Sequence, residues 1–195
     1  MSKIDAKYLN PFDNFLTHIF DKYVSNFFYA CNLTPNMITT LGLLSAVISM
    51  IYFLKEVFIL SGGFFLVSYF FDCADGYYAR KYNMTSKYGD YYDHIVDLLK
   101  LLSFGTIVLY KLYSSGRFLS MVILIFIALM TGKHVSYQEY VYNNTKSVIE
   151  SPTLKFTSIF SNEKNINVIK QKMRLTRYLA DGTFFLYFTY LIVSL

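Results

Sequence analysis

Five stretches of mostly apolar sequence, each long enough for a helix that crosses a bilayer (~20 residues), most constrain this chain. They occupy 36–54, 57–82, 88–113, 117–142 and 175–195. Hydrophobic residues make up 54% of the chain and charged residues 16%, whereas a soluble domain carries ~25% charged residues. A soluble fold is therefore excluded. The sequence predicts an all-α integral membrane protein with a single membrane domain over 1–195.

One more helix is predicted before these stretches. Apolar residues recur at i, i+3, i+4 and i+7 over 11–30, which indicates an amphipathic helix lying in the membrane interface. Asn10 fits as its N-cap and Pro11 as its first helical residue. The predicted bundle thus has this interfacial helix and five transmembrane helices, and a sixth crossing within 147–172 stays open.

Basic residues indicate which side faces the cytosol. Thirteen Lys and Arg lie in the amino-terminal segment and in the second and fourth connections, against three in the other two connections. The long connection 143–174 is therefore predicted to be cytosolic. The net charge of +5 on so apolar a chain favours an anionic membrane face or phosphate ligands over DNA, so no nucleic-acid partner is expected.

Aspartates are concentrated where the second and third stretches meet this cytosolic side. Carboxylates near membrane depth are costly unless they are paired, hydrated or bound to metal, and several together repel one another. Oxygen ligands of this kind suit Mg²⁺ or Mn²⁺, and two such ions are a common clamp for displacement at phosphorus. The five residues are Asp72, Asp75, Asp90, Asp93 and Asp97.

Helical geometry predicts that the acidic faces meet. Asp72 and Asp75 share one face of the second helix, and Asp93 and Asp97 share one face of the third. An antiparallel hairpin turning near 84–85 places Asp72 level with Asp97 and Gly76 level with Asp93. Small residues opposite carboxylates leave a pocket between the helices.

The string Asp72-x2-Asp75-Gly76-x2-Ala79-Arg80-x8-Gly89-x3-Asp93-x3-Asp97 resembles the signature of the CDP-alcohol phosphotransferase family, class I, and all eight positions match. Pro35-Asn36-x2-Thr39 is similar to a weaker pattern of the same family. Together with the interfacial helix, the likeness covers about 11–113. The family usually has six spans, whereas five are found here.

The resemblance implies a role for each matching residue. Asp72, Asp75 and Asp93 would ligate two divalent ions, and Asp97 would be the general base, with an additional metal contact open. Arg80 would meet the donor phosphates, and the small residues would let cytidine and ribose approach, although close helix packing explains small residues too. The implied nucleotide-binding set is Asn36, Thr39, Asp72, Gly76, Ala79, Arg80 and Gly89.

Four more polar residues are candidates for acceptor or phosphate contacts. His94 after Asp93 is similar to the choline/ethanolamine phosphotransferase branch, which however has glycine where Ile95 stands. Lys100 lies one turn from Asp97, where it reaches a phosphate or offsets the acidic charge. Lys133 and His134 could line an acceptor pocket, and placement at the interface explains them equally well.

The resemblance implies an enzyme that transfers a substituted phosphate group from a CDP-linked donor to an acceptor hydroxyl and releases CMP. Because the chain is short, CDP-diacylglycerol is the favoured donor, so the group transferred would be phosphatidyl. A homodimer in the lipid bilayer is expected on the same ground. One alternative is a CDP-choline or CDP-ethanolamine:diacylglycerol phosphotransferase. Another is a non-catalytic, cation-binding membrane protein. An intramembrane prenyltransferase is disfavoured because the chain lacks a second acidic motif late in its sequence.

Overall fold

The computed structural model describes residues 5–145, 163 and 165–195, and this part of the chain is helical and without strands. The described residues divide into two compact units. The first comprises 15–121 and 185–195, and the second comprises residues up to Asn14 together with 122–184. That the whole chain acts as a single membrane domain stays a prediction.

The amino-terminal helix has the predicted bounds but is not uniform. It runs as α1 (Pro11–Ile19), a π-helical turn η2 (Phe20–Val24) and α2 (Ser25–Ala30), after a short 3₁₀ turn η1 (Ala6–Tyr8). The predicted N-cap is confirmed, because Asn10 Oδ1 accepts a hydrogen bond from the Phe12 backbone N–H at 2.9 Å. In the first unit Phe20 is fully buried against Ile38, Ala74 and Tyr78, which fixes this segment to the helices that follow.

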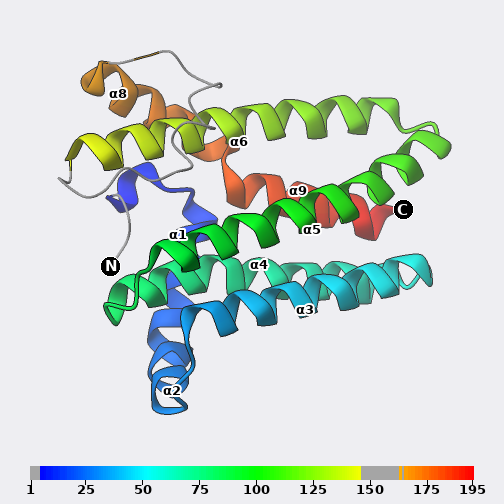
Figure 1. The fold of residues 1–195 in the computed structure, drawn as a ribbon. Helices are drawn as coiled ribbons and strands as arrows, with labels where there is room; N and C mark the ends of the chain where they lie inside the picture. Colours follow the sequence, from blue (N-terminus) through cyan, green and yellow to red (C-terminus); the bar gives the residue numbers. More distant parts are fainter. Residues whose placement is uncertain (1–4, 146–162, 164) are drawn as a thin grey trace. The chain divides into compact units, whose positions relative to one another are not determined.

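Three long helices form the centre of the first unit: α3 (Pro35–Leu54), α4 (Phe58–Lys81) and α5 (Lys87–Ser114). They run antiparallel in sequence order, with α3 packed on both α4 and α5 (Figure 1). Pro35 is the first residue of α3, and the hydroxyl of Thr34 caps it by accepting from the Met37 N–H.

In the middle turns of α3, the face that packs inward is made of small and polar residues. Gly42, Ser45, Ala46 and Ser49 are buried, while Leu44, Val47, Ile48 and Ile51 are exposed. The Ser49 hydroxyl donates to the Ser61 carbonyl oxygen of α4 at 2.7 Å. Small residues let the backbones approach closely, and the larger apolar side chains are left to face lipid.

Aromatic rings and a glycine join the carboxyl-terminal helix α9 (Asp181–Ser194) to α4 in the first unit. Tyr69 stacks on Phe185 with ring centroids 3.9 Å apart, and Phe65 contacts Phe188 at 4.9 Å. A Cβ at Gly62 would lie 2.6 Å from Val193 Cγ2, so a larger residue there would force the two helices or the Val193 side chain to shift.

The predicted stretch 175–195 differs from the structure near its beginning, at residues of the second unit. α6 (Phe118–Thr145) leads, after a gap in the description, to α8 (Ile166–Thr176), a 3₁₀ turn η4 (Arg177–Leu179) and then α9. The stretch is broken by this turn, and α9 has 14 residues, about 21 Å at 1.5 Å per residue.

Side chains satisfy the backbone at this break. The freed carbonyl oxygen of Arg177 accepts from Asn10 Nδ2 at 2.8 Å, that of Tyr178 from Thr183 at 2.7 Å, and that of Leu179 from Thr131 at 3.1 Å. These bonds replace the helical bonds that a continuous helix would have made. Most of the predicted connection 143–174, and of the suggested sixth crossing in 147–172, lies outside the described residues.

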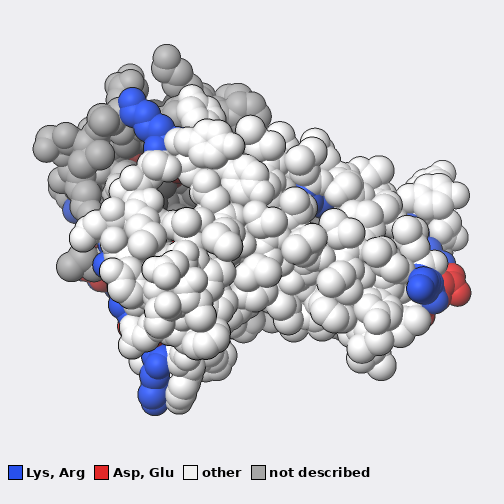
Figure 2. Space-filling view, turned by 60° about the horizontal axis from the view of Figure 1, so that its bottom comes forward, with Lys and Arg blue, Asp and Glu red and all other residues white. Residues whose placement is uncertain are grey.

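In the described part of the chain, three helices are long and apolar enough to cross a membrane: Pro35–Leu54, Phe58–Lys81 and Phe118–Tyr142. α5 has the length, with 28 residues, but it carries the charged residues of the acidic motif. Figure 2 shows a face that is mostly free of charged residues, with a small blue patch inside it and the other visible Lys, Arg, Asp and Glu near its ends. Apolar side chains exposed on such a surface need a lipid solvent.

Candidate functional site

Two carboxylates of the motif come from α4. Asp72 and Asp75 are three residues apart, which puts them on one face of the helix. Asp75 is buried, with 4% of its surface exposed. Its Oδ2 accepts a hydrogen bond from the Thr39 hydroxyl of α3 at 2.6 Å, and its Oδ1 accepts one from the Gly76 N–H at 2.5 Å. The side chain of Asp75 is therefore held by two neighbours.

The turn between α4 and α5 sets the position of the other two carboxylates. Asn83 takes the left-handed conformation (φ 57°), which Asn tolerates better than most residues. Ser86 then caps α5, its hydroxyl accepting from the Gly89 N–H at 3.0 Å. With the start of α5 fixed in this way, Asp93 and Asp97 lie one turn apart on one face.

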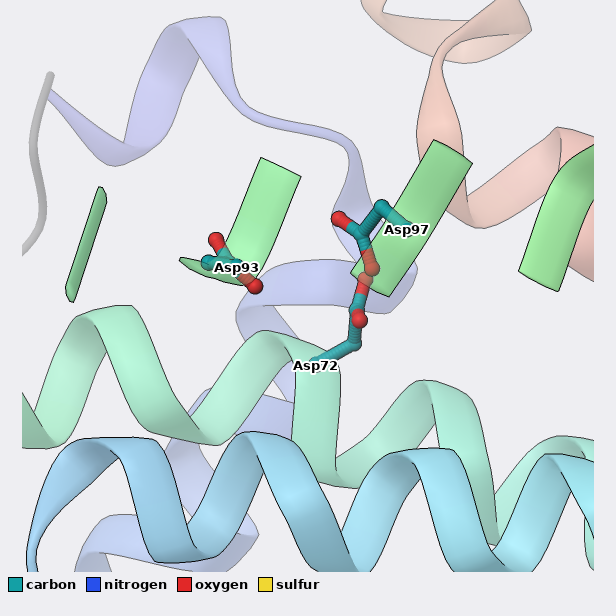
Figure 3. A group of neighbouring side chains, drawn as sticks. All are labelled: Asp72, Asp93 and Asp97. Carbon is teal, nitrogen blue, oxygen red and sulfur yellow. The ribbon is translucent and has the colours of Figure 1, made fainter. Parts of the chain in front are cut away.

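The two acidic faces meet, as the hairpin register predicts. Asp72, Asp93 and Asp97 each offer a carboxylate oxygen, and these oxygens all lie within 4.8 Å of one another. Figure 3 shows the Asp97 side chain pointing towards Asp72, with Asp93 beside them on α5. Asp75 is outside this set of three, one turn from Asp72 on α4. Three of the four predicted metal ligands thus converge.

Lys100 is the basic residue of the cluster. Its Nζ lies 2.5 Å from Asp72 Oδ1 and 2.7 Å from Asp97 Oδ1, so it bridges α4 and α5. Of the two sequence-based interpretations of Lys100, these ion pairs support the one in which it offsets acidic charge.

The predicted nucleotide-binding residues lie around the same end of these helices. A Cβ at Gly89 would be 3.1 Å from Asn36 Oδ1, and a Cβ at Gly76 would be 3.2 Å from Arg80 Nη1. The absence of a side chain at Gly89 leaves room for the Asn36 amide, and its absence at Gly76 leaves room for the Arg80 guanidinium. This is one structural reason for glycine at both positions. Ala79 is half-buried on α4. Nucleotide contact by this set stays a prediction.

Of the other candidates, His94 is not brought into the cluster. His94 is exposed on α5, and its Nδ1 lies 2.6 Å from the backbone carbonyl oxygen of Asp90. Lys133 and His134 belong to the second unit, where Lys133 is exposed. His134 is fully buried there, with Nδ1 2.8 Å from the Thr176 hydroxyl. Acceptor contacts by these residues remain predictions.

Two contacts of the site escaped sequence reasoning. The hydroxyl of Thr39, a residue of the predicted nucleotide-binding set, donates a hydrogen bond to Asp75. The next residue, Thr40, bonds the Tyr92 hydroxyl of α5 at 2.9 Å. Adjacent threonines thus hold α3 to both of the helices that carry aspartates. A pair of hydroxyl residues one turn into an otherwise apolar helix was the available signal.

The family model for CDP-alcohol phosphatidyltransferase matches residues 32–190. This match covers most of the chain and includes every residue of the acidic cluster, so the chain belongs to this family. Comparisons with curated proteins and with solved structures find no match. The family comprises membrane transferases of substituted phosphate groups, which use a CDP-alcohol donor, a hydroxyl acceptor and a divalent metal ion.

The residues present fit a divalent cation. Three carboxylate oxygens converge from two helices, and oxygen donors are what Mg²⁺ and Mn²⁺ prefer. Moreover, Asp93 Oδ1 is buried and has no hydrogen-bond partner among the described residues. Buried polar atoms normally have a hydrogen-bond partner. This oxygen instead has lone pairs that a cation could accept.

Proposed function

We propose that this protein transfers a phosphatidyl group from CDP-diacylglycerol to the hydroxyl of an acceptor alcohol and releases CMP. The observation that carries the proposal is the convergence of Asp72, Asp93 and Asp97 in a chain of the CDP-alcohol phosphatidyltransferase family. Such a set of carboxylates on one hairpin suits chemistry at a pyrophosphate, where negative charge must be balanced by cations.

Asp72, Asp75 and Asp93 are assigned to two Mg²⁺ or Mn²⁺ ions. When bound, these ions would neutralise the donor pyrophosphate and polarise the phosphorus that is attacked. Asp75 is fixed by Thr39 and by the Gly76 N–H, so it is held ready for a ligand without a change of rotamer. A carboxylate that is already fixed favours metal binding, because little side-chain entropy is lost when the ion binds.

Asp97 is assigned the role of general base. Its side chain is 42% exposed, against 16% for Asp72, so it is the more open to an incoming acceptor. The acceptor hydroxyl gives its proton to the Asp97 carboxylate as its oxygen bonds to the phosphorus next to diacylglycerol. The bond from that phosphorus to the bridging oxygen breaks, and CMP leaves with the electron pair.

The cytidine end of the donor is assigned to the end of the hairpin where Asn36, Gly76 and Gly89 lie, with Arg80 at the phosphates. The close approach of Asn36 to Gly89 and of Arg80 to Gly76 supports this placement. Thr39 and Ala79 complete the assigned set. The site is proposed to face the cytosol, on the distribution of Lys and Arg between the connections. Dimerisation stays an expectation.

A second candidate reaction transfers phosphocholine or phosphoethanolamine from its CDP ester to diacylglycerol. Asp90 after Gly89 and His94 after Asp93 favour it, because the corresponding branch of the family has acidic and histidine residues there. The two reactions use the same cluster and differ in which substrate carries the lipid. Lys133 and His134 are kept as candidate contacts of the acceptor.

Purified protein in detergent tests the proposal. CDP-diacylglycerol is supplied with inositol, glycerol phosphate, serine or inositol phosphate, and CDP-choline or CDP-ethanolamine is supplied with diacylglycerol in separate reactions. CMP release is measured, and the lipid formed is identified by mass spectrometry. We expect CMP and one new lipid from a CDP-diacylglycerol reaction. Product only from the CDP-aminoalcohol reactions would select the second candidate.

Asp97→Asn is the matching variant, and Glu56→Gln is its control. Loss of a general base typically lowers the reaction rate by a factor of about 10² to 10⁴, so the rate of CMP release should fall at least about 10²-fold in Asp97→Asn. Glu56 pairs with Lys111 away from the cluster and should leave the rate unchanged. No CMP from any donor, in protein that is folded, would favour a non-catalytic cation-binding protein.

A further inference from the structure

Lys100 is packed between the two aspartates that belong to different helices. Its side chain is 10% exposed and that of Asp72 is 16% exposed, so this ion pair is largely withdrawn from water. The same ammonium contacts Asp97 at 2.7 Å. It donates to Asp72 Oδ1 at 2.5 Å, which is a short, charge-assisted hydrogen bond.

These contacts offset only part of the charge in the cluster. The oxygens of Asp72, Asp93 and Asp97 converge within 4.8 Å, where three carboxylates repel one another strongly. One ammonium cannot balance them all. Asp93 Oδ1 accepts no hydrogen bond from the described residues, although it is buried. With Lys100 in place, the cluster therefore still presents an oxygen that a cation could bind.

A metal ion and the Lys100 ammonium would draw on the same two carboxylates, those of Asp72 and Asp97. Mg²⁺ binds oxygen at about 2.0–2.1 Å, closer than an ammonium can approach, so the two cations cannot share one lone pair. A divalent ion that ligates Oδ1 of Asp72 or Asp97 must displace Lys100 from that atom. An ion that bound beside the ammonium would still be repelled by its charge.

We propose that Lys100 is a built-in competitor of the divalent ion: it holds Asp72 and Asp97 together in the metal-free protein and weakens metal binding. The proposal rests on the metal site of the proposed function, but not on the donor or acceptor. Lys100 is thus a positioning residue. It keeps the two acidic helices together before a metal ion binds. Because the ion must displace Lys100, metal binding is weaker and more readily reversible.

Direct metal titration tests this in the full chain, purified in detergent and stripped with a chelator. Mn²⁺ is added without donor or acceptor, and free Mn²⁺ is followed by electron paramagnetic resonance. Lys100→Met should bind Mn²⁺ about tenfold more tightly than wild type, as expected when a competing ligand of one site is removed. Lys100→Arg keeps the charge and should bind as weakly as wild type.

Thermal unfolding gives a second readout that distinguishes competition from simple packing. Without metal, Lys100→Met should melt below wild type, because Asp72 and Asp97 then face each other without a cation. Saturating Mn²⁺ should raise its Tm more than that of wild type and close the gap. A purely structural lysine would leave a deficit of the same size at every Mn²⁺ concentration.

Two further variants serve as a fallback for folding and as a matched control. Lys100→Gln keeps a long side chain with a hydrogen-bond donor, so it should fold even where Lys100→Met does not, and it should also bind Mn²⁺ more tightly. Lys111→Met is the matched control, because Lys111 lies three turns along the same helix and pairs with Glu56 at 2.8 Å. It should bind Mn²⁺ like wild type.

Wild-type or weaker Mn²⁺ affinity in both Lys100→Met and Lys100→Gln would overturn the proposal, as would the absence of Mn²⁺ binding in every variant. CMP release is measured on the same preparations. Tighter Mn²⁺ binding in the two variants with no CMP from wild type would contradict the proposed function and leave this inference standing. CMP release by wild type, with unchanged Mn²⁺ affinity in the two variants, would support the proposed function and overturn this inference.

Discussion

The Thr39 hydroxyl of α3 donates a 2.6 Å hydrogen bond to Asp75 Oδ2 of α4, and both side chains are buried. This bond links α3, which carries no aspartate of the motif, to Asp75, one turn from Asp72 on α4. It also explains how a carboxylate at membrane depth is kept in one orientation, since an unpaired buried carboxylate is costly.

Replacing Thr39 with valine keeps its shape and removes this bond. A hydrogen bond to a charged group contributes ~1.5–3 kcal/mol, so we expect CMP release to fall about 10–100-fold in Thr39→Val. Thr40→Val is the matched control, because it removes the neighbouring bond to Tyr92, which involves no carboxylate. Equal losses of rate in the two variants would show that the bond to Asp75 has no special part in catalysis.

Gly89 and Asn36 make a second test at the nucleotide end of the hairpin. A methyl group at Gly89 would lie 3.1 Å from Asn36 Oδ1 and 3.0 Å from Ser86 Oγ, so these side chains must shift. We expect Gly89→Ala to raise KM for the CDP-linked donor about tenfold, which corresponds to ~1.4 kcal/mol of binding. Gly63→Ala, which would meet nothing within 4 Å, should leave KM unchanged. An unchanged KM in Gly89→Ala would remove this residue from the donor site.

Asp21 and Lys81 give a prediction about pH. The Lys81 ammonium, 2.6 Å from Asp21 Oδ1, lowers the pKa of the Asp21 carboxyl below its ordinary value of 3.8. As the pH falls, Asp21 is therefore protonated in the unfolded chain before it is protonated in the folded protein. The ion pair thus stabilises the fold above pH 3.8, and this stabilisation is lost as the pH falls through the lowered pKa. The Asp21 side chain is 40% exposed, which limits the contribution to below about 1 kcal/mol.

Thermal unfolding in detergent between pH 6 and pH 3 checks this. Asp21→Asn should melt below wild type at pH 6, and the difference in Tm should shrink as the solution becomes more acidic. Lys81→Met should lower Tm with the same pH dependence. A difference in Tm that is constant over this pH range would mean that Asp21 acts through packing and not through its charge.

The acidic hairpin could be predicted from the sequence because its geometry is local. The spacing of Asp72, Asp93 and Asp97 along two helices joined by a short turn fixes which residues lie level. The structure adds that Asn83 and Ser86 set this turn, through a left-handed backbone and a helix cap. Both residue types are common at such positions.

The packing of α3 could not be predicted from hydrophobicity. In water the apolar face of a helix turns inward, but α3 buries Gly42, Ser45 and Ser49 and exposes Leu44 and Ile48. Lipid removes the penalty for exposed apolar side chains, so the hydrophobic pattern no longer indicates which face packs. The repeat of small residues was the informative signal.

The break before α9 was also hidden from sequence reasoning. It depends on Asn10, which is more than 160 positions away in the chain and whose amide donates to the Arg177 carbonyl oxygen at 2.8 Å. Gly182 permits this approach, since a Cβ there would lie 2.6 Å from Asn10 Oδ1. Long-range contacts of this kind leave no periodic trace in either segment.

The central claim is that the carboxylates of α4 and α5 form a divalent metal site that drives phosphatidyl transfer. The most direct measurement is CMP release from CDP-diacylglycerol by protein stripped with a chelator, before and after Mg²⁺ or Mn²⁺ is restored, in wild type and in Asp93→Asn. We predict no release from stripped protein, recovery with either ion in wild type, and little recovery in Asp93→Asn. Release that persists after stripping, or full recovery in Asp93→Asn, would contradict the claim.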